Sequence, residues 1–190
     1  MTAEPLGLPE VLLLSPRLLR DARGHFFESW SADRHASLGV DVAFVQDNVS
    51  YSTRGVLRGL HLQHPDDQGK LVTVLRGAIW DVAVDVRRGS PTFGRWVGAK
   101  LTADDARQLW IPPGFAHGFV VTGDEALVTY KCTAPYRPAS EITVAWDDPA
   151  LAIEWPLDGA PVLSARDAEA PRLAELSGRL PSYAGAAVGA

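Results

Sequence analysis

Cysteine is nearly absent from this sequence, because Cys132 is the only one among 190 residues. A single cysteine excludes a disulfide within the chain and a metal site made only of cysteines, and it is compatible with a reducing compartment. The N-terminus lacks the basic start of a signal peptide, and no run approaches the roughly 18 apolar residues of a membrane helix. We therefore expect a cytoplasmic protein that does not enter a membrane.

An excess of positive charge is also lacking. The chain carries 18 Lys and Arg against 23 Asp and Glu, a net charge of -5. This balance does not favour a nucleic acid polymer or an anionic membrane as partner, so an anionic ligand would need a local cluster of basic side chains. With 46% apolar and 22% charged residues, the composition is that of a globular protein. The length fits one domain, assigned to residues 1–183, and we expect the small-residue tail 184–190 to be flexible.

Short alternating apolar runs fill the middle of the sequence. They predict antiparallel strands at residues 44–48, 59–64, 70–75, 79–86, 95–101, 108–111, 118–121, 127–133 and 142–146. Arg76–Gly77 and Thr122–Asp124 are turn sequences that we expect to separate neighbouring strands. Helical patterns are limited to residues 31–38 and 164–176, near the two ends. The pattern predicts a mostly β protein, an antiparallel sandwich or barrel with a few short helices.

Polar residues within apolar strands are the candidate functional residues, because burying a polar group costs energy unless it is paired. The two-residue period of a strand places His61 and Gln63 on one face and His64 on the other. The two histidines then cannot both face one metal ion, as a His-x-His pair would. Arg58 shares a cavity with His61 only if the strand is interrupted at Gly59, where a bulge costs little. A buried histidine held by hydrogen bonds remains an alternative for His61.

The other candidates have structural alternatives as well. Lys70 could be a solvated strand end, and Tyr130 could be a core tyrosine with a satisfied hydroxyl. Asp167 could be the acid of a helix-capping box. Asp81 and Asp85 share one strand face, where two carboxylates require water or cationic partners.

Together, a histidine, a carboxylate, a lysine and a tyrosine indicate a more specific chemistry than any one of them. A neutral histidine, with a reference pKa of about 6.5, is a usable base near neutral pH if a carboxylate holds its other nitrogen. A lysine can stabilise an enolate oxygen, and a tyrosine can return a proton from the opposite face. This set suits proton abstraction next to a carbonyl. The sequence shows no nucleophile flanked by a base, no glycine-rich phosphate loop and no dinucleotide fingerprint.

A long ordered set of motifs surrounds these candidates. It comprises Asp21-x-Arg23-Gly24-x-Phe26-x-Glu28, Phe44-Val-Gln46-Asp47-Asn48-x-Ser50-x-Ser52, Val56-Leu-Arg58-Gly-Leu-His61-x-Gln63, Gly69-Lys70-Leu-Val, Asp81-Val-Ala-Val-Asp85-x-Arg87, Ser90-Pro-Thr-Phe-Gly94, Ile111-Pro-x-Gly-Phe-Ala-His117-Gly-Phe119, Tyr130-Lys131, Tyr136-x-Pro138, Trp155-Pro156 and Leu163-Ser-x-x-Asp167. In this order the motifs resemble the dTDP-4-dehydrorhamnose 3,5-epimerase family over nearly the whole chain.

The resemblance implies a jelly-roll cupin fold and a homodimer that works without a metal or redox cofactor. It implies epimerisation of dTDP-4-dehydro-6-deoxy-D-glucose at C3 and C5, through an enolate, to the dTDP-4-dehydro-L-rhamnose used for surface polysaccharide. By matched position His61 is the general base with Asp167 as its partner. Tyr130 is then the acid on the other face, and Lys70 is the group beside the C4 carbonyl.

The resemblance also implies contacts to the sugar nucleotide, at Arg23, Phe26, Glu28, Gln46, Asn48, Arg58, Lys70, His117, Tyr136, Glu141 and Arg166. Arg23 and Arg58 suit the diphosphate, since a guanidinium can bind two oxygens at once. We expect the segment around Arg23 to reach the cavity of the partner subunit in the dimer. Ile142 and Arg166 stand where family members commonly have glycine and lysine, so these departures concern the nucleotide contacts near Glu141.

Three classes of function remain open on the sequence alone. The first is an epimerase, acting on both centres or on C3 or C5 only. The second is a metal-dependent cupin such as a dioxygenase, which would use His61, His64 and His117 but is disfavoured by their spacing. The third is a sugar-nucleotide binding protein without catalysis. The joint presence of base, carboxylate, lysine and tyrosine favours the first class.

Overall fold

Two long antiparallel strands organise the computed structural model, which describes residues 1–184. β7 spans Lys70–Asp85 and β10 spans Phe115–Cys132, and the two pair from one end to the other. The register of this pairing shifts between Val121 and Ala126, near the middle. Of the tail that we expected to be flexible, only Ala184 belongs to the described part of the chain.

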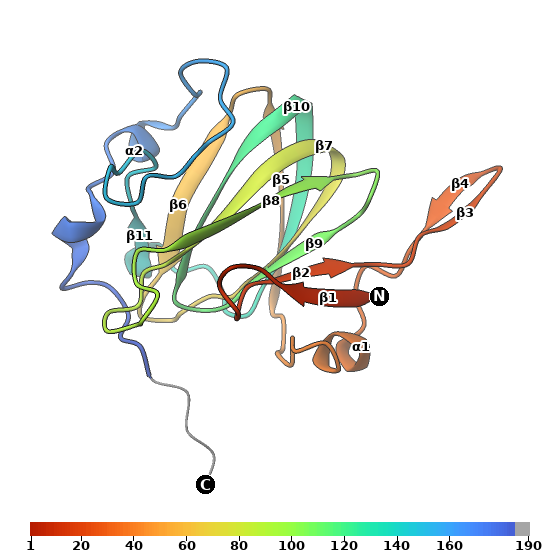
Figure 1. The fold of residues 1–190 in the computed structure, drawn as a ribbon, viewed down its shortest axis with the longest axis horizontal. Helices are drawn as coiled ribbons and strands as arrows, with labels where there is room; N and C mark the ends of the chain where they lie inside the picture. Colours follow the sequence, from red (N-terminus) through yellow and green to blue (C-terminus); the bar gives the residue numbers. More distant parts are fainter. Residues whose placement is uncertain (185–190) are drawn as a thin grey trace, which may run out of the picture.

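Each half of these two strands belongs to a different layer (Figure 1). The first half of β7 pairs with β9 (Gln108–Ile111), and the last half of β10 pairs with β5 (Gln46–Thr53). Beyond β9, this layer continues with β2 (Leu12–Ser15) and β1 (Thr2–Pro5). The second half of β7 pairs with β8 (Trp96–Thr102) and the first half of β10 with β6 (Leu57–Gln63), followed by β11 (Glu141–Thr143). The two layers are therefore β1-β2-β9-β7-β10-β5 and β8-β7-β10-β6-β11. The predicted antiparallel β sandwich is confirmed.

The turns expected within β7 and β10 are instead bends inside continuous strands. Gly77 has a φ of +77°, and a Cβ there would lie 1.7 Å from the carbonyl oxygen of Glu125 on the facing strand. Only glycine fits this close approach, and the bulge lets both strands turn from one layer into the other. The expectation of separate strands was wrong because a glycine in a strand can mark a corner as well as an end.

Apolar side chains fill the space between the layers and also cover their outer faces. Between the layers lie inward residues of both sheets, among them Val72, Ile79, Leu109, Phe119 and Val128. The outer face of the β6 layer packs against the C-terminal segment, and the outer face of the β9 layer packs against the region around α1 (Ala32–Ala36). Both outer faces are therefore covered by other parts of the chain.

The helices are short, as expected, but the second one differs from its prediction. The expected helix at residues 164–176 is split into α2 (Ala165–Ala168) and the 3-10 helix η2 (Leu173–Leu176). Pro171 lies between them, and a proline lacks an N–H and disfavours helical backbone at the preceding residue. A further 3-10 helix, η1, spans Pro138–Ser140. Within residues 1–184 no helix has the length and apolar character needed to span a membrane.

A two-stranded hairpin projects away from the sandwich (Figure 1). It consists of β3 (Leu19–Asp21) and β4 (Gly24–Phe26), and all six of these residues are exposed. Within residues 1–184 its strands pair only with each other. No periodic apolar pattern marks these strands, which is why they were absent from the predicted set.

Candidate active site

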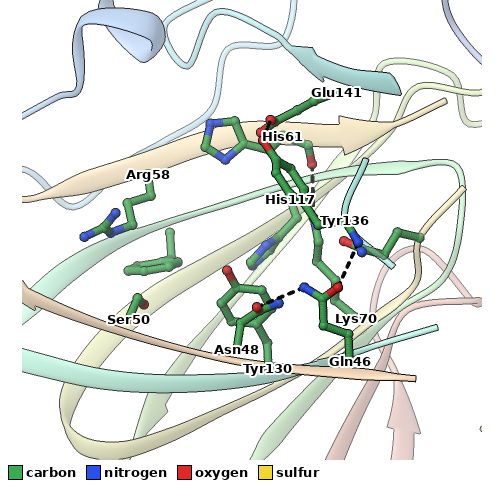
Figure 2. Close-up of a pocket in the computed structure, with 12 residues that line it drawn as sticks. Gln46, Asn48, Ser50, Arg58, His61, Lys70, His117, Tyr130, Tyr136 and Glu141 are labelled. Carbon is green, nitrogen blue, oxygen red and sulfur yellow. Dashed lines mark hydrogen bonds between the residues drawn. The ribbon is translucent and has the colours of Figure 1, made fainter. Parts of the chain in front are cut away.

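A cavity of about 350 Å³ lies between the two layers and opens to solvent (Figure 2). Its lining consists of Gln46, Asn48, Ser50, Arg58, His61, Gln68, Lys70, His117, Phe119, Tyr130, Tyr136 and Glu141. Sequence reasoning missed Ser50, Gln68 and Phe119. Strand alternation could have found two of them, since Ser50 follows Asn48 by two residues and Phe119 follows His117 by two.

Arg58 reaches the same cavity as His61 because strand β6 is interrupted between them. The pairing of β6 with β10 shifts register between His117 and Phe119, and Gly59 has a φ of +136°. A Cβ at Gly59 would lie 2.5 Å from the Cα of Gly118, so the two backbones approach as only glycines allow. From the sequence, Arg58 could share the cavity with His61 only if the strand had a bulge at Gly59, and this bulge is present.

His61 forms a close pair with a buried carboxylate. Its Nε2 lies 2.6 Å from Oδ1 of Asp167, whose side chain is 5% exposed. The backbone N–H of Asp167 donates to Ser164 Oγ, so Asp167 sits in a capped turn of α2 and also meets the histidine. Burial acts to raise the pKa of Asp167, but hydrogen bonds and the charge of His61 outweigh it and hold the pKa below its ordinary value. The carboxylate therefore stays ionised beside the imidazole.

Tyr130 lies opposite His61, and Lys70 is a buried residue of the cavity lining. Tyr130 lies on the half of β10 that pairs with β5, while His61 lies on β6, so the two face each other from different layers (Figure 2). Burial raises the pKa of Tyr130, which keeps its hydroxyl protonated. Lys70 is buried, not solvated, and burial lowers its pKa against the opposing effect of Cys132 and of nearby carboxylates.

His117, which lines the same cavity, belongs to a second histidine–aspartate pair. His117 Nε2 lies 2.6 Å from Oδ1 of Asp81, and both side chains are buried. Asp81 thus has the partner that its strand position required. Asp85 is held instead by Arg87, Ser90 and Thr92. Nowhere within residues 1–184 do three or more His, Cys, Asp or Glu side chains gather as they would around a metal ion.

Glu141 connects the mouth of the cavity to α2. Its carboxylate accepts hydrogen bonds from the Tyr136 hydroxyl and from Arg166 Nη1, and Arg166 Nε donates to Thr143 Oγ1 at 3.2 Å. Burial acts to raise the pKa of Glu141, but Arg166 and Tyr136 outweigh it and lower that pKa. Arg166 does not line the cavity and meets it only through Glu141. Ile142, the other departure from the family pattern, is buried in the outer core of the β6 layer.

Three predicted site residues lie away from this cavity, on or just after the projecting hairpin. Arg23 pairs with Asp21 at 2.5 Å, and Glu28 pairs with Arg34 at 2.7 Å. The side chain of Phe26 is 68% exposed. Within a single copy of the chain, these residues are not brought together with the others.

The model of the dTDP-4-dehydrorhamnose 3,5-epimerase family matches residues 5–175. The chain belongs to this family. It is 51% identical over 176 residues to the dTDP-4-dehydrorhamnose 3,5-epimerase of Pseudomonas aeruginosa, covering 92% of this chain and 97% of that one. The predicted membership is confirmed, and the protein is an isomerase of the epimerase class.

Solved structures of epimerases share the whole fold. The dTDP-6-deoxy-D-glucose-3,5-epimerase of Legionella pneumophila, in complex with dTDP-4-keto-L-rhamnose, has a TM-score of 0.94 and 48% identity, covering 97% of this chain and 99% of that one. A 3'-monoepimerase of Streptomyces bikiniensis, in complex with dTDP-quinovose, has a TM-score of 0.88 and 39% identity, covering 96% and 93%. The predicted cupin-type jelly roll is confirmed.

Proposed function

We propose that this epimerase inverts C3 and C5 of dTDP-4-dehydro-6-deoxy-D-glucose to give dTDP-4-dehydro-L-rhamnose. One observation carries the proposal: a histidine paired with an ionised aspartate and a protonated tyrosine face each other across a cavity that also holds a buried lysine. Inversion beside a carbonyl requires removal of a proton from one face and delivery to the other. The family membership adds the sugar nucleotide as substrate class.

Each group has one role in the proposed reaction. His61 takes the proton from the carbon next to the C4 carbonyl, and the electron pair of that C–H bond moves onto O4 as an enolate. Asp167 orients the imidazole and stabilises its protonated form. Lys70 donates a hydrogen bond to the developing charge on O4. Tyr130 then delivers its hydroxyl proton to the other face of the carbon, and exchange with water restores both groups.

The remaining cavity residues bind the substrate. We assign the diphosphate to Arg58, which is oriented by Ser52 Oγ at 3.0 Å and by the carbonyl oxygen of Tyr51 at 3.3 Å. Contacts to the rest of the sugar nucleotide come from Gln46, Asn48, His117, Tyr136 and Glu141, with Arg166 holding Glu141 in place.

We further propose a homodimer in which the projecting hairpin completes the partner's cavity. Among the residues that the structure describes, β5 pairs with β10 on one side only, and its outward residues Val49 and Tyr51 are 64% and 55% exposed. Such an edge favours pairing with a second copy. Arg23, Phe26 and Glu28 would then contact the nucleotide of the partner subunit. Light scattering should show a dimer at working concentration, and an active monomer would contradict this arrangement.

A cytoplasmic location fits the single buried cysteine.

Proton NMR in heavy water tests the function directly. With dTDP-4-dehydro-6-deoxy-D-glucose, we expect loss of the C3 and C5 proton signals together with the appearance of the inverted product. Exchange and inversion at one centre only would make the protein a mono-epimerase, like its Streptomyces relative. A sugar nucleotide that binds without exchange at either centre would overturn the catalytic proposal.

A further inference from the structure

Tyr136 lies in a segment that no strand or helix holds in place. Residues 133–137, between β10 and η1, have no regular secondary structure. The peptide groups around Tyr136 are bonded to side-chain amides instead. Gln63 Nε2 donates to the carbonyl oxygen of Pro135 at 3.1 Å, and Gln63 Oε1 accepts from the N–H of Arg137 at 2.7 Å. Gln46 Oε1 accepts from the N–H of Tyr136 itself at 2.8 Å. Gln68 Nε2 also donates to the carbonyl oxygen of Ala134 at 2.6 Å, so three glutamines replace the ladder that a strand would supply.

Gln63 is placed for this task by the pairing of β6 with β11. It lies opposite Glu141 in the register, so the two side chains are cross-strand neighbours on one face. Gln63 is 5% exposed and does not line the cavity, whereas Glu141 does. Glu141 accepts the hydrogen bond of the Tyr136 hydroxyl. The peptide groups on either side of Tyr136 are therefore held by Gln63, and its hydroxyl is held by Glu141, the cross-strand neighbour of Gln63.

The ring of Tyr136 stands at the mouth of the cavity. It lines the cavity and is nevertheless 50% exposed, and in Figure 2 it lies between Glu141 and Gln46. A half-exposed ring on an irregular segment keeps a fixed position only if its backbone is fixed. We propose that Gln63 is a positioning residue that fixes Tyr136 for substrate binding. This inference rests on the proposed function, in which Tyr136 contacts the sugar nucleotide.

The test measures KM and kcat for epimerisation in two backgrounds. Gln63→Met keeps the length of the side chain and removes its hydrogen bonds, so we expect KM to rise about tenfold while kcat stays within about threefold. In a Tyr136→Ala background, the same Gln63→Met change should alter KM less than about twofold, because the ring that it positions is gone. An unchanged KM in Gln63→Met, or effects on KM that multiply in the double variant, would overturn the inference.

Gln108 offers a matched control for simple loss of packing. It is 2% exposed, and its amide donates to the carbonyl oxygen of Ser29 and to Thr73 Oγ1, away from the cavity. Gln108→Met should lower the melting temperature and leave KM unchanged. If both variants raised KM alike, Gln63 would be a structural residue only. If the parent protein did not epimerise the substrate, the proposed function would fail first and independently of Gln63.

A second variant keeps the test decisive if Gln63→Met does not fold. In Gln63→Glu the neutral acid keeps one of the two donor hydrogens of the amide, which can reach Pro135, and it can still accept from Arg137. The ionised form has no donor and repels the carbonyl oxygens of Pro135 and Asp66. The KM of the variant relative to the parent should therefore fall towards one as the pH is lowered. The parent, measured at each pH, corrects for titration of the charged neighbours Asp66 and Glu141. A KM ratio independent of pH would contradict positioning through these bonds.

Discussion

Asp167→Asn removes one charge from the proposed base and leaves its surroundings nearly unchanged. The carboxylate lies 2.6 Å from His61 Nε2, is buried, and keeps a lowered pKa beside the histidine. An asparagine of the same shape can still accept a hydrogen bond from the imidazole. It cannot stabilise the imidazolium that forms when His61 takes a proton.

The size of the effect follows from that one hydrogen bond. A hydrogen bond to a charged group contributes about 1.5–3 kcal/mol. Each 1.4 kcal/mol or so corresponds to a tenfold change in rate. Because the His61 charge develops in the transition state, the loss should fall on kcat. We expect a decrease of about 10- to 150-fold, smaller than the loss caused by removing the imidazole in His61→Ala.

The assay is deuterium incorporation at C3 and C5, followed by proton NMR in heavy water. Asp67→Asn is the matched control, because Asp67 pairs with His64 at 2.8 Å outside the cavity. We expect Asp67→Asn to exchange at the parent rate and Asp167→Asn to slow exchange and inversion together. Equal rates for Asp167→Asn and the parent would show that Asp167 only caps its helix and does not assist His61.

The remaining predictions concern the acid, metal and stability. Tyr130→Phe should still exchange, by return of the proton through His61, but should invert at least about 100-fold more slowly; inversion at the parent rate would make Tyr130 a core residue. Protein treated with a chelator should keep full activity, and activity restored by a divalent ion would favour a metal-dependent cupin. Burial acts to raise the pKa of Asp85, but hydrogen bonds from Arg87 and two hydroxyls outweigh it and lower this pKa from 3.8 to about 2. The shift corresponds to about 2 kcal/mol of folding stability. That stability is present above about pH 4 and lost as the pH falls through about 2, so urea unfolding of Asp85→Asn should lack this part of the acid dependence.

Strand alternation predicted the site better than it predicted the ends of the strands. The period of two correctly placed Asp81 and Asp85 on the face opposite Val82, and this face is the interior of the sandwich. It also separated His61 from His64. The same reasoning failed at Gly77, where a turn signal proved to be a corner, because local sequence does not show whether a strand continues beyond a bulge.

Contacts between distant parts of the chain could not be predicted from local pattern. Asp167 meets His61 across 106 positions of sequence, and Ser164 to Asp167 reads equally well as a simple cap. It was the resemblance to a family, and not periodicity, that predicted Asp167 as the partner of His61. Gln63 was placed on the His61 face, but its role depends on an irregular segment whose path no pattern of residues predicts.

The opposition of acid and base follows from the way in which β10 crosses the sandwich. Its first half pairs with β6, which carries His61, and its last half carries Tyr130 and pairs with β5 in the other layer. The bend near Gly77 is what places the two halves in different layers. A flat sheet would put both groups on one side of a substrate and would permit exchange without inversion. Two layers with a cavity between them let one group act on each face of a sugar ring, which is the geometry that inversion requires.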